Sequence, residues 1–144
     1  MGTWMTRAKQ TIFQIINNIT TQYKDLAIRV AFVGYRDFCD KEQYAIMDFT
    51  QDIKSIQDFI QSQRAMGGGD GPEDVVGGLF NTLNLNWQSE NRFTFLICDA
   101  PAHGFKYHKI KGNYDDYPKG SPDKRVLEDV VKCFSEQNIH FIGI

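Results

Sequence analysis

The chain has 144 residues, of which 42% are hydrophobic and 24% charged, and this composition is that of a globular domain rather than a disordered chain. Its net charge of -2 gives no reason to expect a nucleic-acid partner. No apolar run approaches the ~20 residues that cross a bilayer, so we expect no membrane span.

The first part of the chain predicts a helix, two strands and a second helix. Apolar residues recur every three to four positions from Trp4 to Tyr23, as in an amphipathic helix. Two apolar segments follow, Leu26 to Tyr35 and Tyr44 to Phe49, and the short polar turn between them predicts antiparallel strands. Ile53 to Ile60 then has the pattern of a helix, with Thr50 as its expected N-cap.

A glycine-rich acidic loop, GGGDGPED at Gly67–Asp74, precedes the third predicted helix. Its three leading glycines permit positive φ values that other residues avoid. Pro72 suits the first turn of a helix. Asp70, Glu73 and Asp74 lie where the helix dipole favours anions. The loop therefore presents carboxylates at a helix start, which is a suitable place for a metal ion.

The last part predicts a strand at Arg92 to Asp99, a long loop, a helix that opens at Ser121-Pro122-Asp123, and a strand at His140 to Ile144. Alternating strands and helices predict an α/β fold with a mostly parallel sheet, one antiparallel hairpin and helices on both faces. The chain starts on a long helix and stops on an uncovered strand, so we expect both ends to be cut from a larger domain.

Three acidic residues map to the sheet edge where ligands bind in such folds. Asp37 and Asp99 stand at the ends of predicted strands, and Asp70 lies in the glycine loop. Carboxylates on several loop tips suit Mg²⁺, which takes about six oxygen ligands. The alternative is that these side chains only cap helices and turns.

His103 and His108 allow a rival hypothesis, in which they bind Zn²⁺ in the long loop together with Asp115 or Asp116. The plainer interpretation is a surface loop whose tyrosines pack on the domain. The glycine loop also invites a phosphate hypothesis, but it lacks the Lys-Ser/Thr of a P-loop and its own acids would repel phosphate.

Four stretches carry a resemblance to a known family. They are VAFVGYRD (Val30–Asp37), GGGDGPEDVVGGL (Gly67–Leu79), FLICDAPAHG (Phe95–Gly104) and YHKIKGNYDDYPKGSP (Tyr107–Pro122). With them the chain resembles a von Willebrand factor A (vWA) domain, most closely the type found with alpha-type protein kinases, and also hemicentin-like and bacterial vWA domains. The resemblance covers nearly the whole chain and implies one Rossmann-like, three-layer domain over residues 1–144.

The resemblance also implies a metal-ion-dependent adhesion site, with Asp70 and Asp99 as metal ligands. Further residues form the expected rim of this site: Asp37, Glu73, Asp74 and His103. The family's first motif, Asp-x-Ser/Thr-x-Ser on the central first strand, is missing, because relatives read Asp-x-Thr-Gly-Ser-Met-Gly where this chain opens with Met1-Gly2. We therefore expect an incomplete domain without its first central strand and its last helix.

The missing strand has two expected consequences. The site lacks one carboxylate and two hydroxyls, so we expect only weak binding of Mg²⁺ or Ca²⁺. The gap in the sheet leaves backbone groups unpaired, so we expect upstream residues, another chain or closure of the sheet to fill it.

The resemblance predicts a non-enzymatic protein-interaction module of adhesion or scaffold type, whose protein ligand completes the metal shell with an Asp or Glu side chain. The alternative is a regulatory or targeting segment of an alpha-type protein kinase whose catalytic domain lies outside this chain. Cys39, Cys98 and Cys133 are widely spaced, which predicts buried free thiols and a cytoplasmic location. The hemicentin-like resemblance leaves an extracellular location open.

Overall fold

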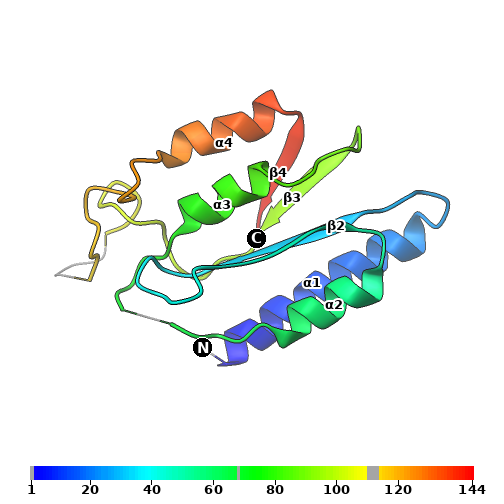
Figure 1. Cartoon of the computed structure of the whole chain (residues 1–144), viewed down its shortest axis with the longest axis horizontal. Helices are drawn as coiled ribbons and strands as arrows, with labels where there is room; N and C mark the ends of the chain where they lie inside the picture. The colour runs from blue at the N-terminus through cyan, green and yellow to red at the C-terminus, as the bar shows by residue number, and fades with distance from the viewer. Residues whose placement is uncertain (1, 68, 110–113) are drawn as a thin grey trace. The chain divides into compact units, whose positions relative to one another are not determined.

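The structure is a computed structural model that describes residues 2–67, 69–109 and 114–144. Within these residues the chain is mixed α/β, with four helices and two pairs of strands (Figure 1). Gly68, residues 110–113 and the side chain of Trp4, which the sequence interpretation uses, lie outside the described part. The chain divides into two compact units, Met1–Phe32 with Ala45–Met66, and Val33–Tyr44 with Gly67–Ile144.

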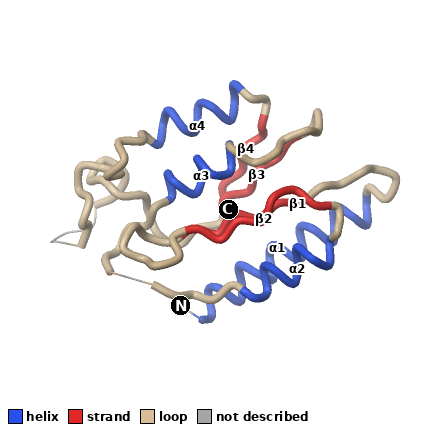
Figure 2. The backbone as a smooth tube through the Cα atoms, in the orientation of Figure 1, coloured by secondary structure: helices blue, strands red, loops and turns tan. Residues whose placement is uncertain are grey.

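The first unit contains helices α1 (Gly2–Gln22) and α2 (Ile53–Ser62), the first half of strand β1 (Val30–Tyr35) and most of strand β2 (Tyr44–Thr50) (Figure 2). The two strands pair in an antiparallel hairpin, as predicted. The core is formed by three buried isoleucines and the apolar strand residues that pack on them: Ile16, Ile56, Ile60, Val30, Phe32 and Met47. The amphipathic pattern is therefore confirmed, because α1 and α2 turn their apolar stripes to a shared core.

The predicted N-cap of α2 is wrong by two residues. Asp52 caps the helix, because its carboxylate accepts a hydrogen bond from the Ser55 N–H at 3.0 Å. Thr50 instead accepts one from the Asp52 N–H at 3.0 Å, which holds the capping residue in place. Asp and Thr are both good caps, so composition could not decide between them.

The second unit contains α3 (Val75–Leu83), β3 (Arg92–Leu96), α4 (Leu127–Glu136) and β4 (Ile139–Gly143). The strands β3 and β4 pair in parallel, from Arg92 opposite Ile139 to Leu96 opposite Gly143. The helix α4 packs against both α3 and β4 (Figure 1). Buried apolar residues from these elements form one core: Val75, Val76, Leu79, Ala102, Val130, Phe134 and Ile139.

The helix α3 begins later than the sequence predicts. Asp74 is its N-cap and accepts a hydrogen bond from the Gly77 N–H at 2.8 Å, so Pro72 lies before the helix rather than in its first turn. Among the described residues of the glycine loop, Gly67 has a positive φ of +98°, a backbone conformation that other residues avoid.

The predicted opening of α4 at Ser121-Pro122-Asp123 is also wrong. Asp123 accepts hydrogen bonds from the Ser121 hydroxyl at 2.7 Å and from the Arg125 N–H at 3.0 Å, which closes a turn of its own. Lys124 then has a φ of +68°, which interrupts the helical path. The helix begins only at Leu127.

The three cysteines are free thiols, as predicted, but they are not buried. Cys39 is exposed, and Cys98 and Cys133 are partly exposed. Among the described residues, no helix combines the length and the apolar character that a membrane crossing requires.

Candidate metal-binding site

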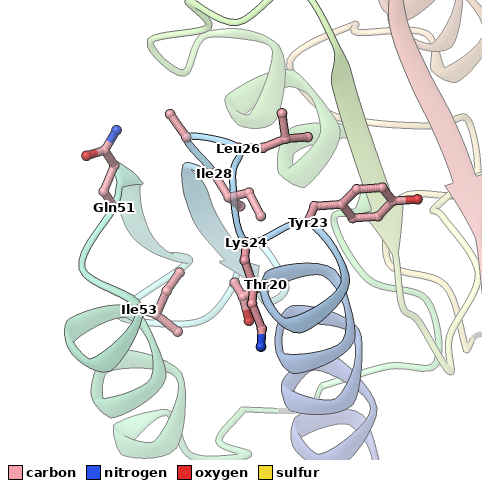
Figure 3. A pocket seen from close by; sticks show the side chains of 8 residues that line it. Thr20, Tyr23, Lys24, Leu26, Ile28, Gln51 and Ile53 are labelled. Carbon is pink, nitrogen blue, oxygen red and sulfur yellow. The ribbon is translucent and has the colours of Figure 1, made fainter.

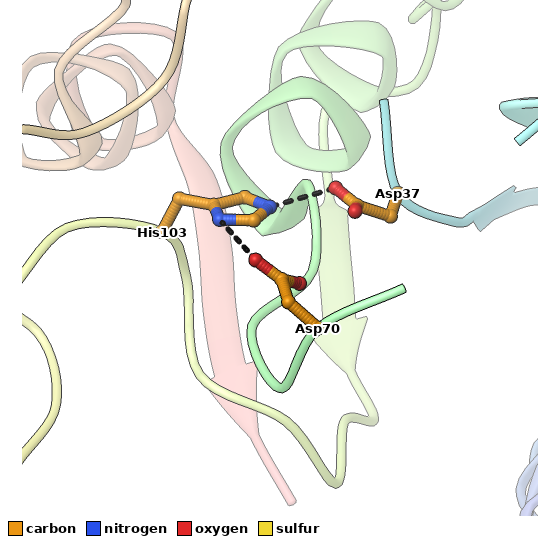
Figure 4. Close-up of side chains that lie close together, drawn as sticks. All are labelled: Asp37, Asp70 and His103. Carbon is orange, nitrogen blue, oxygen red and sulfur yellow. Dashed lines mark hydrogen bonds and ion pairs between the residues drawn. The ribbon is translucent and has the colours of Figure 1, made fainter. Parts of the chain in front are cut away.

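Three loops of the second unit bring Asp37, Asp70 and His103 together (Figure 4). Asp37 follows β1, Asp70 belongs to the glycine loop, and His103 lies beyond β3. His103 Nε2 is 2.7 Å from Asp37 Oδ1, and His103 Nδ1 is 3.8 Å from Asp70 Oδ2. Each residue offers one ligand atom, and these atoms lie within 4.8 Å of one another. The group could hold a metal ion.

Backbone hydrogen bonds tie the glycine loop to the long loop. The Glu73 N–H donates to the Pro101 carbonyl at 3.0 Å, and Glu73 forms an isolated parallel bridge with Ala102. The Gly71 N–H donates to the Tyr114 carbonyl at 2.9 Å. Asp70 is therefore positioned by backbone contacts on its C-terminal side, and its carboxylate is held against His103.

Asp115 fixes the orientation of the His103 ring. Its carboxylate lies 2.8 Å from His103 Nδ1 and 2.8 Å from His108 Nε2. It also accepts hydrogen bonds from the N–H groups of Gly104 and Tyr117, each at 2.8 Å. Burial alone would raise the pKa of Asp115, but these four donors outweigh it and lower the pKa to about 2.

The group is shielded from water. Asp37 and His103 are each 2% exposed, and the side chain of Asp70 is 4% exposed. The rings of Phe38 and Tyr117 lie 5.6 and 5.0 Å from the imidazole, measured between ring centroids. Electrostatic interactions are stronger in such an environment than in water.

The group carries more acceptors than donors. Asp70 Oδ2 accepts a hydrogen bond from the Asp116 N–H, but Asp70 Oδ1 is buried and has no partner among the described residues. Glu73 Oε2 is likewise buried and has no hydrogen-bond partner among the described residues. Burial raises the pKa of the Asp70 carboxyl. The unmatched oxygens indicate a site suited to a cation.

Glu73 makes the stability of this region depend on pH. Burial, followed by the charges of Asp37, Asp40 and Asp99, raises its pKa to about 7 from an ordinary 4.5. The folded chain therefore holds the proton of the Glu73 carboxyl group more tightly than the unfolded chain does. Protonated Glu73 favours folding below pH 4.5, and this contribution to stability is lost as the pH rises through 7.

We expect Glu73→Gln to reduce the loss of thermal stability between about pH 5 and pH 8, since glutamine stays neutral. Melting curves followed by circular dichroism in metal-free buffer measure this loss. Glu90→Gln, at an exposed position, is the matched control and should follow the parent chain. An equal loss in Glu73→Gln and the parent chain would contradict the assignment.

Two other acids of the sequence prediction lie outside the three-residue group. Asp99 is exposed just after β3, and its charge contributes to the raised pKa of Glu73. Asp74 is buried and is the N-cap of α3. Its carboxylate also accepts hydrogen bonds from Gln43 at 2.8 Å and from the Tyr44 hydroxyl. The ligand role predicted for Asp99 stays a prediction.

The structure combines the two sequence hypotheses in a way that neither stated. His103 and His108 share Asp115, as the rival zinc hypothesis paired them, while His103 also joins Asp37 and Asp70. The role of Asp115 as the support of His103 is absent from the sequence interpretation. No spacing rule signals it, because Asp115 lies twelve positions after His103 along the chain.

A shallow pocket of about 290 Å³ lies in the first unit (Figure 3). Its walls come from the end of α1, the segment before β1 and the start of α2: Thr20, Tyr23, Lys24, Leu26, Ala27, Ile28, Gln51 and Ile53. These residues offer no carboxylate, imidazole or thiol, so the pocket lacks the groups that hold a metal ion.

No family model and no solved structure matches the chain. The chain is 29% identical over 143 residues to the alpha-protein kinase vwkA of Dictyostelium discoideum, which covers 98% of the chain and 22% of the kinase. It is 30% identical over 105 residues to a putative ariadne-like RING finger protein of Acanthamoeba polyphaga mimivirus, covering 72% of the chain and 10% of that protein. The chain thus spans about a fifth and a tenth of these relatives. The similarity indicates that this chain is related to a region of an alpha-protein kinase.

Proposed function

We propose that the chain is a non-enzymatic protein-interaction module of the vWA type, a single domain with a three-layer fold. The resemblance of its loop sequences supports this, and so does the relationship to vwkA over nearly the whole chain. The observation that carries the proposal is the buried group of Asp37, Asp70 and His103 at the loop end of the second unit. Buried, unmatched acids with loops around them suit the capture of a cation, and through it of a partner's carboxylate.

The residues present fit a divalent cation. Asp70 Oδ1 is buried without a partner among the described residues, so a cation there would satisfy an oxygen that is otherwise unpaired. Asp37 and Asp70 supply negative charge, and His103 supplies a nitrogen. Asp99 is exposed, and its predicted role as a metal ligand is part of this proposal. A bound cation would supply positive charge for an Asp or Glu side chain of a protein ligand, and because the three side chains are only 2–4% exposed, the loops around them would have to open for that ligand to reach the cation.

Affinity capture tests this function. The immobilised chain is incubated with lysate in Mg²⁺, in Zn²⁺ and in EDTA, and the retained proteins are quantified by mass spectrometry. We expect a set of proteins that requires the metal and falls about tenfold or more with Asp70→Asn. Asp58→Asn, which removes an exposed carboxylate on α2, is the matched control and should retain the set. Capture that ignores EDTA and Asp70→Asn would contradict the metal-mediated mechanism.

A regulatory or targeting segment of an alpha-type protein kinase is the second candidate. The similarity to vwkA covers 98% of this chain, and this observation favours it. In that case the chemistry lies in a domain outside this chain. Sequencing of the complete transcript separates the two functions, because an alpha-kinase catalytic domain in the same reading frame is expected only for the second.

A further inference from the structure

We propose that this group is a mixed nitrogen–oxygen metal centre that selects Zn²⁺ over Mg²⁺ and Ca²⁺. Its ligands are His103 Nε2, Asp37 and Asp70, and Asp115 is a positioning residue. The inference rests on the proposed cation site but not on the proposed protein partner. It departs from the Mg²⁺ or Ca²⁺ that the sequence resemblance implies.

The nitrogen ligand is prepared by Asp115. Since that carboxylate already receives three other hydrogen bonds, it is a fixed acceptor, and His103 donates its Nδ1–H to it at 2.8 Å. The opposite nitrogen, Nε2, is hydrogen-bonded to Asp37 Oδ1 at 2.7 Å (Figure 4), and a metal ion bound there would take the place of the proton between them. A metal-ligating histidine usually donates its other ring N–H to a carboxylate, as His103 does to Asp115.

The oxygen ligands come from two separate loops. Asp70 Oδ2 is 3.8 Å from His103 Nδ1 (Figure 4), and its ligand atom lies within 4.8 Å of those of Asp37 and His103, so this carboxylate has to turn toward Nε2 to share an ion with Asp37. The Asp70 side chain is 4% exposed, and its Oδ1 lacks a partner among the described residues. Asp37 Oδ1 is 2.7 Å from Nε2. Two ligands of a tetrahedral zinc ion lie roughly 3.3 Å apart when each is about 2.0 Å from the metal. Nε2 and Asp37 Oδ1 therefore need to move only slightly apart to bind the ion.

The donor set decides the metal. Imidazole nitrogen suits Zn²⁺, whereas Mg²⁺ and Ca²⁺ prefer six or more oxygen ligands. Three protein ligands leave one position of a tetrahedral zinc ion open. A water molecule can take that position.

Equilibrium dialysis of the complete chain against each metal alone tests the inference, with bound metal measured by mass spectrometry. We expect one equivalent of Zn²⁺, held at least about tenfold more tightly than Mg²⁺ or Ca²⁺. His103→Gln and Asp70→Asn should remove this preference. Asp115→Asn should weaken Zn²⁺ binding by about 10–100-fold and shift the visible spectrum of bound Co²⁺, which a purely structural role would not change. Asp70→Asn keeps the test valid if His103→Gln fails to fold.

Two controls separate this site from other zinc ligands. His140→Gln removes a histidine that stacks on Phe93 in the sheet, and it should leave Zn²⁺ binding unchanged. Cys39→Ser removes the exposed thiol that lies 3.5 Å from Asp37 Oδ2, and it should also leave binding unchanged. Loss of binding in either control, or equal affinity for Zn²⁺ and Mg²⁺, overturns the inference. Chelator-sensitive capture of proteins without a preference for Zn²⁺ would overturn this inference alone, and tight Zn²⁺ binding without such capture would count only against the proposed function.

Discussion

Replacing Asp115 with alanine is expected to lower the free energy of unfolding by about 3–5 kcal/mol. The Asp115 carboxylate is buried and contacts His103, His108 and two backbone N–H groups. Removing it leaves all four donors without this acceptor, and each unpaired buried donor costs about 1–3 kcal/mol. The hydrogen bonds that hold the long loop to the site are lost together.

Urea denaturation followed by tryptophan fluorescence measures this effect, because Trp87 packs against the core of the second unit. Asp116→Ala is the matched control, since it removes the neighbouring, exposed carboxylate, and it should change the free energy of unfolding by less than about 0.5 kcal/mol. Similar values for the two variants would show that Asp115 does not support the loop.

Acid should reproduce part of the Asp115→Ala effect. The folded pKa of Asp115 is about 2 and its ordinary value is 3.8, so its contribution to stability is present above pH 3.8 and is lost as the pH falls through 2. The Asp115→Ala chain lacks this contribution at every pH. Its stability should therefore fall less than that of the parent chain across this range.

Gly77→Ala is expected to destabilise the chain by about 1–3 kcal/mol, although alanine is the better helix former by about 1 kcal/mol. A Cβ at Gly77 would lie 2.0 Å from Asp74 Oδ2 and 2.1 Å from the Tyr44 hydroxyl oxygen. The Tyr44 hydroxyl donates a hydrogen bond to Asp74 at the start of α3, and Asp74 accepts the capping hydrogen bond from the Gly77 N–H. Movement of either side chain to make room for the Cβ would therefore disturb the N-cap. Loss of a cap by itself costs about 1 kcal/mol.

Thermal and urea unfolding compare this variant with Gly143→Ala. A Cβ at Gly143, on β4, would meet no atom within 4 Å, so that substitution should be neutral or slightly stabilising. Stabilisation by Gly77→Ala would mean that helix propensity outweighs the contacts of Asp74 and that the cap is not as tightly held as its hydrogen bonds indicate.

Much of the secondary structure was predictable because it depends on local periodicity. The apolar stripe of α1, the antiparallel hairpin of β1 and β2 and the parallel strand β4 all follow from spacing along the chain. Helix starts were less predictable. Asp52, Asp74 and Asp123 all stand near a helix start, yet the first two cap a helix and the third closes a turn before one. Composition alone does not separate these roles, because the same carboxylate suits both.

Two acids of the glycine loop also have different roles that their sequence positions do not distinguish. The sequence singled out Asp70 and Asp74 together, since both lie beside the start of a predicted helix. The structure gives them different partners: Asp74 bonds to the backbone of its own helix and to Gln43 and Tyr44, while Asp70 faces His103. Which acid is free for a cation therefore depends on contacts with residues thirty or more positions away along the chain.

The sequence by itself determined the amphipathic helices and the antiparallel hairpin, and it predicted that Asp70 belongs to a site at the strand ends with Asp37 and His103 at its rim. Only the tertiary structure decided that His103 stands between Asp37 and Asp115 and that Asp99 is exposed. The physical reason is the separation along the chain between the residues that interact. Periodicity and capping are set by neighbours within a few residues, whereas the site is formed by side chains from loops that meet only when the chain folds, and these contacts leave no fixed spacing in the sequence.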